Sequence, residues 1–217
     1  MTIERARVTW EGGEVTAIVE GSGPQGILLA HGAGTDQEHP AMAGLRSGLA
    51  GGGHSVMTFN YPYTERGSKR PDNQDRLVKC HKAAAGYLAA RVDRLFLAGR
   101  SMGGRMGTYV AAEGHRTDGL ILYAYPLHPA GKPENLRVSQ FPNITQPMLF
   151  LQGTNDALSR MDLFDEHIAS LPNAEVEVLE GAGHGYRGGG WTLESMTARY
   201  VSASLAWIDR MSSGTSR

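Results

Sequence analysis

The sequence contains a single cysteine, Cys80, among its 217 residues. One cysteine cannot form a disulfide within the chain, so nothing in the sequence requires an oxidising compartment. An excess of charge is also missing, because 21 Lys and Arg residues stand against 22 Asp and Glu residues. This balance gives no electrostatic reason to expect a nucleic acid or an anionic membrane as partner.

Long apolar runs are missing as well. The longest, such as residues 120–125, fall far below the roughly 20 residues that a membrane-spanning helix needs. The amino terminus is charged and no apolar stretch follows it, which excludes a secretory signal of the usual form. Cys80 and His81 adjoin without a second pair at metal-ligand spacing. We therefore expect a cytoplasmic protein without metal or cofactor.

The pattern of apolar residues predicts an α/β fold. Short, nearly continuous apolar runs are typical of strands covered on both faces of a parallel sheet. Residues 175–179 instead alternate polar with apolar, which predicts a last strand near an edge. Two further runs flank Gly12 and Gly13 and predict an amino-terminal hairpin. The continuous runs are residues 26–30, 56–59, 95–98, 120–125 and 148–151, and the hairpin strands are residues 8–10 and 15–19.

Predicted helices fill the gaps between these strands. One begins at a cap formed by Asp72 or Asn73, and the last begins at the cap Thr192. The last helix carries an apolar stripe at spacings of three and four, which predicts a face against the core. The alternation predicts a mostly parallel, twisted sheet with helices on both faces, in one domain over residues 1–217. Further helices are predicted at residues 40–49, 102–112 and 161–171, and the stripe is Leu193, Met196, Tyr200, Ala203 and Trp207.

The clearest chemical motif is the Gly-x-Ser-x-Gly sequence around Ser101. It follows an apolar strand and precedes a predicted helix, so the serine lies on a sharp strand-to-helix turn. Glycine at 99 and 103 removes side chains that would collide with this turn. The turn also places Ser101 at the amino end of a helix, where the N–H of Met102 faces a developing oxyanion. We therefore expect Ser101 to be a nucleophile.

A serine nucleophile needs a base and a group that orients the base. Asp156 follows the apolar strand at 148–151, and His184 follows the last predicted strand in a glycine-rich loop. Both loops lie at the carboxyl ends of strands, where α/β sheets place their sites. We expect His184 to be the base and Asp156 to orient it. The alternatives are His31, His39 and His128 for the base, and Asp162 and Asp165 in the following helix for the acid.

The second oxyanion donor is expected from the loop that follows the strand at 26–30. Gly32 and Gly34 let the backbone approach closely, and we select the N–H of Ala33, paired with that of Met102. His31 is expected to hydrogen-bond within this loop.

A basic segment leaves a strand at the same end of the predicted sheet as Ser101. It spans residues 64–76, and Arg100 adds a cation beside the nucleophile. Arg70 and Arg100 are candidate contacts for an anionic group on the substrate. The alternative is a solvated loop that pairs with Asp72 or Asp75.

Taken in order, these motifs resemble those of the dienelactone-hydrolase-like α/β hydrolases. The branch most similar in motif includes testis-expressed proteins and a subunit of the non-specific lethal chromatin complex. The resemblance covers about residues 24–210. Dienelactone hydrolases proper use a cysteine nucleophile where this chain has Ser101, so the resemblance implies the fold and the triad and not lactone specificity. The motifs are residues 31–34, 59–63, 99–104, 125–129, 152–156 and 183–185.

The resemblance implies an α/β-hydrolase fold, and the spacing of the strands implies that it has no cap domain. Only about twenty residues separate the strand at 120–125 from Met148, too few for a helical cap. The function expected is a serine esterase acting on short-chain or accessible acyl groups of a small-molecule ester, as a monomer or homodimer. An acyltransferase or peptidase is a related possibility. The alternative from another class is a weakly active or inactive hydrolase-fold binding or scaffold protein.

Overall fold

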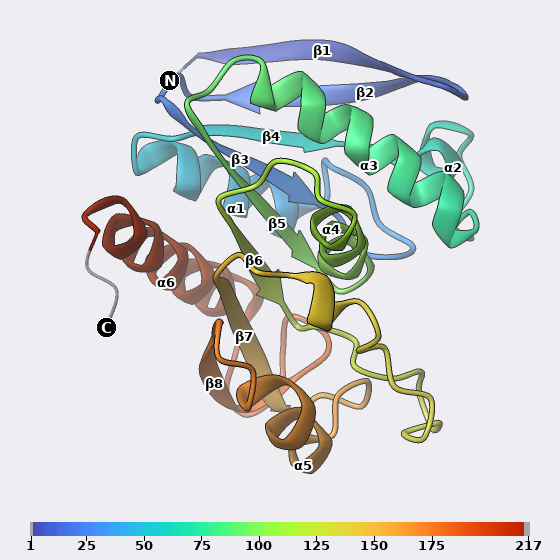
Figure 1. Ribbon diagram of the computed structural model, residues 1–217, viewed down its shortest axis with the longest axis vertical. Coiled ribbons are helices and arrows are strands. Elements are labelled where there is room, and N and C mark those ends of the chain that lie inside the picture. Colours follow the sequence, from blue (N-terminus) through green and yellow to red (C-terminus); the bar gives the residue numbers. More distant parts are fainter. Residues whose placement is uncertain (1, 215–217) are drawn as a thin grey trace.

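Within residues 2–214, eight strands form one sheet in the order β1-β2-β4-β3-β5-β6-β7-β8. The computed structural model describes residues 2–214, so residues 1 and 215–217 of the expected 1–217 domain lie outside the described residues (Figure 1). Neighbours from β4 to β8 pair in parallel, whereas β1 with β2 and β2 with β4 pair antiparallel. The strands are β1 Ile3–Trp10, β2 Gly13–Glu20, β3 Gln25–Ala30, β4 Ser55–Phe59, β5 Arg94–Arg100, β6 Gly119–Tyr123, β7 Met148–Asn155 and β8 Ala174–Gly183.

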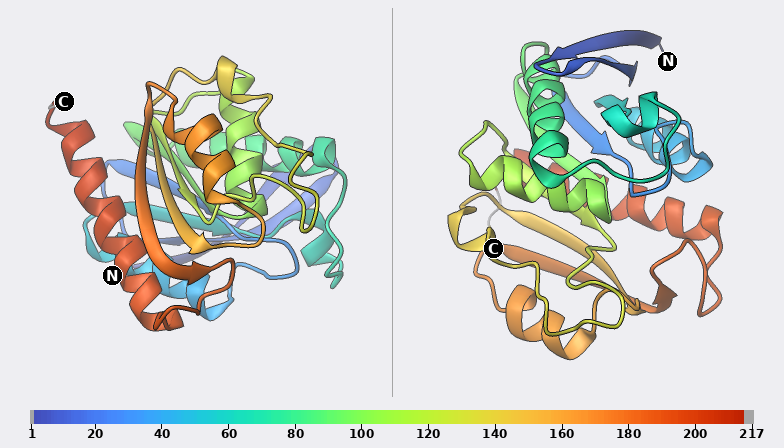
Figure 2. Two further views of the ribbon diagram at one scale, coloured as in Figure 1. Left: turned by 90° about the horizontal axis from the view of Figure 1, so that it is seen from below. Right: turned by 90° about the vertical axis from the view of Figure 1, so that its right-hand side faces the viewer.

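The structure confirms the predicted mostly parallel sheet and extends several of its strands. The predicted amino-terminal hairpin is β1 and β2, joined so that Trp10 pairs with Gly13. The strand with alternating polarity is β8, which lies at the edge of the sheet opposite β1. Figure 2 shows that the sheet is twisted between these two edges.

Helices connect the strands and cover both faces of the sheet. Asn73 caps α3 by accepting a hydrogen bond from the N–H of Arg76, and Thr192 caps α6. The helix predicted at residues 161–171 is instead one α-helical turn followed by a wide π-helical turn, Asp165–Ala169. The helices are α1 Pro40–Gly51, α2 Pro62–Glu65, α3 Gln74–Ala89, α4 Met102–Ala112, α5 Met161–Phe164 and α6 Leu193–Ser212, with a 3₁₀ turn at Phe141–Asn143.

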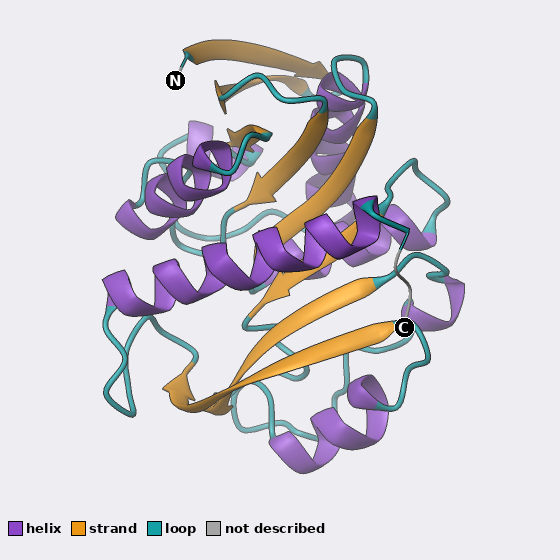
Figure 3. Ribbon diagram, turned by 90° about the vertical axis from the view of Figure 1, so that its left-hand side faces the viewer, coloured by secondary structure: helices purple, strands orange, loops and turns teal. Residues whose placement is uncertain are grey.

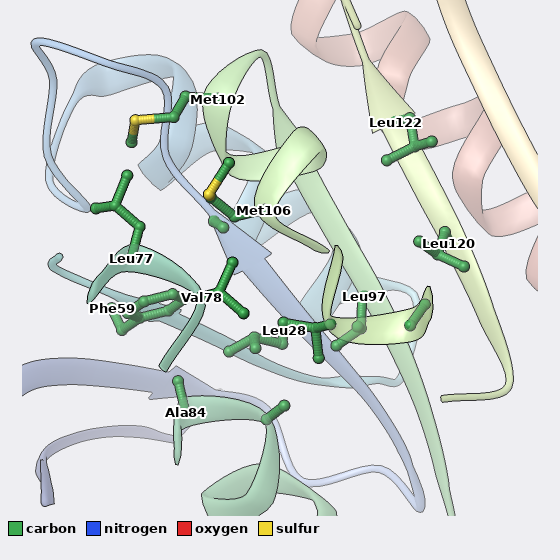
Figure 4. Packing of buried hydrophobic residues seen from close by; sticks show 14 of the residues in the cluster. Leu28, Phe59, Leu77, Val78, Ala84, Leu97, Met102, Met106, Leu120 and Leu122 are labelled. Atoms are coloured by element: carbon green, nitrogen blue, oxygen red, sulfur yellow. The ribbon is translucent and has the colours of Figure 1, made fainter. Parts of the chain in front are cut away.

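The core consists of two apolar clusters, one on each face of the sheet. One lies under α3, α4 and α5, and Figure 4 shows part of it, with Leu77 and Met106 above Leu28 and Leu97 of the strands. The other lies under α1 and α6, which Figure 3 shows on the opposite face.

The stripe predicted for α6 is buried over most of its length. Met196, Tyr200 and Trp207 lie in the core, but Leu193 is 39% exposed. Leu193 is in the first turn of the helix, where it lines a surface groove with Pro40 and Gly44 of α1. The prediction of a core position was therefore wrong for Leu193.

The strand order creates a switch point between β3 and β5. The chain leaves β3 through α1 towards β4 on one side, and it leaves β5 through α4 towards β6 on the other. In open α/β sheets, ligands bind at the carboxyl ends of two such strands, where the connections diverge. The loop that starts at His31 and the turn at Ser101 meet here.

The connection between β6 and β7 carries no lid. Within residues 2–214 this segment contains only the 3₁₀ turn at Phe141–Asn143 as helical structure.

No helix in the described part of the chain combines the length and apolarity that crossing a membrane requires.

Candidate active site

Ser101 lies on a strained turn between β5 and α4. Its backbone has φ of 51° and ψ of −116°, in the positive-φ region that non-glycine residues rarely adopt. A Cβ atom at Gly99 would lie 2.4 Å from the backbone N of Gly104, and one at Gly103 would lie 2.3 Å from the Ala30 carbonyl oxygen. Both glycines are therefore required for the turn to pack against itself and against the end of β3.

Ser101, His184 and Asp156 form a continuous hydrogen-bonded network. The Ser101 Oγ lies 2.9 Å from His184 Nε2, and His184 Nδ1 lies 2.8 Å from Asp156 Oδ2 and 3.0 Å from Oδ1. The carboxylate accepts only, so Nδ1 carries the proton and leaves Nε2 free to accept from the serine hydroxyl. Ser101 is 7% exposed and Asp156 is 4% exposed, whereas 24% of the His184 side chain is exposed, so the serine and the carboxylate are shielded from water and the imidazole is not.

Two further groups hold the Asp156 carboxylate. The backbone N–H of Leu158 donates to Oδ1 at 2.8 Å, and the Gln152 side-chain amide donates to Oδ2 at 3.0 Å. Gln152 is fully buried in β7. Sequence analysis did not identify Gln152, although its position four residues before Asp156, at the end of an apolar strand, was a usable signal.

The loop after β3 lies directly beside the nucleophile. A Cβ atom at Gly32 would be 3.7 Å from the Cβ of Ser101. Ala33 is exposed, and neither its N–H nor that of Met102 donates a hydrogen bond to another residue in the described part of the chain. Both proposed oxyanion donors are thus free to receive a substrate oxygen.

His31 braces this loop. Its Nδ1 lies 2.8 Å from the Gly32 carbonyl oxygen, and its Nε2 accepts from the backbone N–H of Tyr61 at 3.2 Å. Burial lowers the pKa of His31 to about 4. With both ring nitrogens occupied and the ring neutral, His31 fits the structural role expected of it.

Arg100 and Arg70, the candidate anion contacts, differ in their surroundings. The Arg100 guanidinium donates a hydrogen bond to the His184 carbonyl oxygen and lies 4.3 Å from the centre of the Tyr186 ring. Arg70 is exposed, and no ion pair of its side chain occurs among residues 2–214. The alternative pairing with Asp72 occurs for its neighbours, because Arg66 lies 2.6 Å and Arg76 3.7 Å from that carboxylate.

The rival histidines and acids have other contacts. His128 Nε2 accepts from the Arg160 N–H at 3.1 Å, and His39 Nδ1 accepts from the Ala41 N–H as the cap of α1. Asp162 forms an ion pair with Arg160. None of these side chains is hydrogen-bonded to Ser101 within the described part of the chain.

Metal ligands are not gathered anywhere in residues 2–214, where no three His, Cys, Asp or Glu side chains are placed to hold an ion. Cys80 is buried, which raises the pKa of its thiol to about 12.

A surface hollow of about 470 Å³ opens beside the His184 loop. Its walls include the rings of His39, Tyr186 and Trp191. The His39 and Tyr186 rings stack with centroids 5.9 Å apart. The hollow therefore combines aromatic residues with the polar side chains of Arg187 and Thr192, and it lies next to Gly185, which follows His184.

Comparison with known proteins agrees with this architecture. The model of a family described as alpha/beta hydrolase domain matches residues 24–209.

Solved structures of similar fold come from bacteria and an archaeon. Est1E from Butyrivibrio proteoclasticus superposes with a TM-score of 0.76 at 15% identity, over 94% of this chain and 99% of that one. It has also been solved with ferulic acid bound. The esterase Pf2001 from Pyrococcus furiosus gives a TM-score of 0.77 at 16% identity, over 96% and 92% of the two chains. A serine hydrolase without lid from Xanthomonas campestris gives 0.72 at 18% identity, over 95% of each chain.

Proposed function

Since the chain belongs to the alpha/beta hydrolase domain family, we propose that it is a serine esterase that cleaves carboxylic esters. The observation that carries the proposal is the hydrogen-bonded network from Ser101 through His184 to Asp156. A strained turn supplies the serine to this network, and strained backbone is typical of functional sites.

The proposed reaction proceeds through an acyl-enzyme. Ser101 Oγ attacks the ester carbonyl carbon while His184 Nε2 takes the hydroxyl proton, and Asp156 stabilises the resulting imidazolium. The N–H groups of Ala33 and Met102 stabilise the oxyanion of the tetrahedral intermediate. His184 then gives its proton to the departing alcohol. In the second half, water loses a proton to His184 and attacks the acyl carbon, which releases the acid and restores Ser101.

The site suits a small or accessible ester. The connection between β6 and β7 lacks a lid in the described structure, so an ester reaches Ser101 from solvent. We assign the hollow lined by His39, Tyr186 and Trp191 to part of the substrate. The ferulic acid bound to Est1E, a protein of the same fold, supports a small ester substrate. Arg70 remains our proposal for contact with an anionic substituent.

A finer assignment within the family also remains a proposal. The ordered motifs support the dienelactone-hydrolase-like branch, with serine in place of cysteine as nucleophile. The complete network supports an enzyme over a hydrolase-fold binding module, because a module that only binds needs no activated serine.

Labelling with a fluorophosphonate probe tests the proposed function. We expect the probe to modify Ser101, which mass spectrometry of the labelled peptide identifies, and expect Ser101→Ala to abolish both labelling and hydrolysis of p-nitrophenyl acetate. Folded protein that is neither labelled nor active would overturn the proposal of an enzyme and favour a hydrolase-fold binding module.

A further inference from the structure

The side chain of Arg100 connects the nucleophile turn to the loop that carries the catalytic histidine. Arg100 precedes Ser101 at the end of β5, and its guanidinium donates to the carbonyl oxygen of His184. The same guanidinium lies over the Tyr186 ring at 4.3 Å. The Arg100 guanidinium thus contacts both His184 and Tyr186.

The surroundings leave Arg100 without a carboxylate partner. No acidic side chain of residues 2–214 lies within ion-pair distance of it, and its Nε is buried without a hydrogen-bond partner. A Cβ atom at Gly32 would lie 3.4 Å from its Nη1, so the side chain passes beside the oxyanion loop. Arg100 is partly buried, and a partly buried charge held by a carbonyl and an aromatic face costs some desolvation energy, so we take its position next to Ser101 as a sign of a role there.

The backbone hydrogen bonds within the loop that follows His184 run from the Gly183 N–H to the Arg187 carbonyl oxygen at 3.4 Å and from the Trp191 N–H to the Gly188 carbonyl oxygen at 2.9 Å, and neither reaches the nucleophile turn. Gly188, Gly189 and Gly190 all have positive φ, and glycine leaves the backbone many alternative conformations. On the amino-terminal side, His184 is held because Gly183 pairs with Asn155 of β7. On the carboxyl-terminal side, the Arg100 contacts with the His184 carbonyl and Tyr186 are what join the loop to the nucleophile turn.

We propose that Arg100 is a positioning residue that fixes the His184 imidazole against Ser101 by clamping the His184 carbonyl and the Tyr186 ring. The inference rests on the proposed function, since it concerns the same triad. In this role Arg100 acts on His184, so its effect on the rate does not depend on an anionic group on the substrate. A displacement of a reacting group by about 1 Å is enough to cost about 100-fold in rate.

Steady-state kinetics of Arg100 variants on a neutral ester test the clamp. We expect Arg100→Met to lower kcat about 10- to 100-fold with KM changed less than about 2-fold, because the base is misplaced while binding is kept. Arg100→Lys should recover part of the rate, since an ammonium still donates to the carbonyl. Tyr186→Leu should lower kcat more than Tyr186→Phe, because only the phenylalanine ring keeps the face for the cation.

A control with similar contacts exists just beyond the end of α3. Arg91 lies 3.5 Å over the Tyr87 ring and donates to the Tyr87 carbonyl at 2.6 Å, so it combines a ring and a carbonyl contact away from the site, as Arg100 does near it. We expect Arg91→Met to leave kcat unchanged.

A double variant separates positioning from other effects. In the His184→Ala background, Arg100→Met should cause no further loss of the residual activity, because the group that it positions is gone. Three results would each overturn the clamp. One is that Arg100→Met lowers the residual activity of His184→Ala as much as it lowers that of the wild type. The others are an activity loss in Arg100→Met that is confined to esters bearing a carboxylate, and an Arg100→Met variant with wild-type kcat. Failure of the proposed function has a different signature, namely Ser101→Ala with wild-type activity.

Discussion

The Nε2 of His31 accepts a hydrogen bond from the backbone N–H of Tyr61 at 3.2 Å. This bond joins the loop after β3 to the loop after β4, and the His31 Nδ1 bond to the Gly32 carbonyl fixes the first of these loops internally. The proposed oxyanion donor Ala33 follows within two residues. We therefore expect the precision of the proposed oxyanion site to depend on a histidine that takes no part in the proposed chemistry.

Replacing His31 tests this dependence. We expect His31→Ala to destabilise the protein by about 1–3 kcal/mol, because it leaves the Tyr61 N–H buried without a partner. We also expect kcat to fall about 10-fold or more as Ala33 loses its position. Urea unfolding and ester hydrolysis measure the two effects. An unchanged kcat in a destabilised but folded His31→Ala variant would show that His31 does not position the proposed oxyanion donor.

The buried histidines make stability depend on pH. Burial lowers the pKa of His31 to about 4 and that of His81 to about 3, whereas unfolded histidine titrates near 6.5. Below pH 6.5 the unfolded chain binds protons that the folded chain does not, so the free energy of unfolding falls as pH drops towards 4. Between pH 6.5 and 5 each of these two histidines should lower the free energy of unfolding by about 1.6 kcal/mol. Urea unfolding at pH 5, 6.5 and 8 measures this; equal stability at all three would contradict it.

Asp156→Asn should impair the proposed catalysis without unfolding the protein. The amide keeps the shape of the side chain but disfavours the tautomer that leaves His184 Nε2 free to accept from Ser101, and a loss of about 10⁴-fold in kcat is expected. The Leu158 N–H still finds the side-chain oxygen. Circular dichroism controls for folding. A kcat within 10-fold of wild type would exclude Asp156 as the orienting acid.

Gly103→Ala should destabilise the nucleophile turn strongly. The added Cβ would lie 2.3 Å from the Ala30 carbonyl oxygen and 2.7 Å from that of His31, which are backbone atoms without room to move. We expect a loss of more than about 3 kcal/mol or failure to fold. Gly86→Ala is the matched control in the helix α3, where a Cβ meets nothing within 4 Å. It should stabilise by about 0.5–1 kcal/mol. Thermal unfolding of both variants provides the comparison.

Most of the fold was predictable because its signals are local. The strands β3 to β7 are short continuous apolar runs, and the cap candidates Asp72 or Asn73, and Thr192, predicted where α3 and α6 begin; the structure selects Asn73. The helix at residues 161–171 was less predictable, because the chain there widens into a π-helical turn after Phe164. Leu193 fits the apolar spacing of α6 but lies in its first turn, where it is 39% exposed in a groove that α1 also lines.

The sequence by itself determined the candidate nucleophile, base and acid, because Gly-x-Ser-x-Gly and two loops at strand ends depend on local residue types and chain order. Only the tertiary structure brought Ser101, Asp156 and His184 into hydrogen-bonding distance. It also decided the contacts of Gln152, His31 and Arg100, whose partners lie on other loops or depend on burial. The residue type determines what chemistry a side chain can perform. The strand order determines its partner, because it brings segments that are far apart in the sequence to one edge of the sheet.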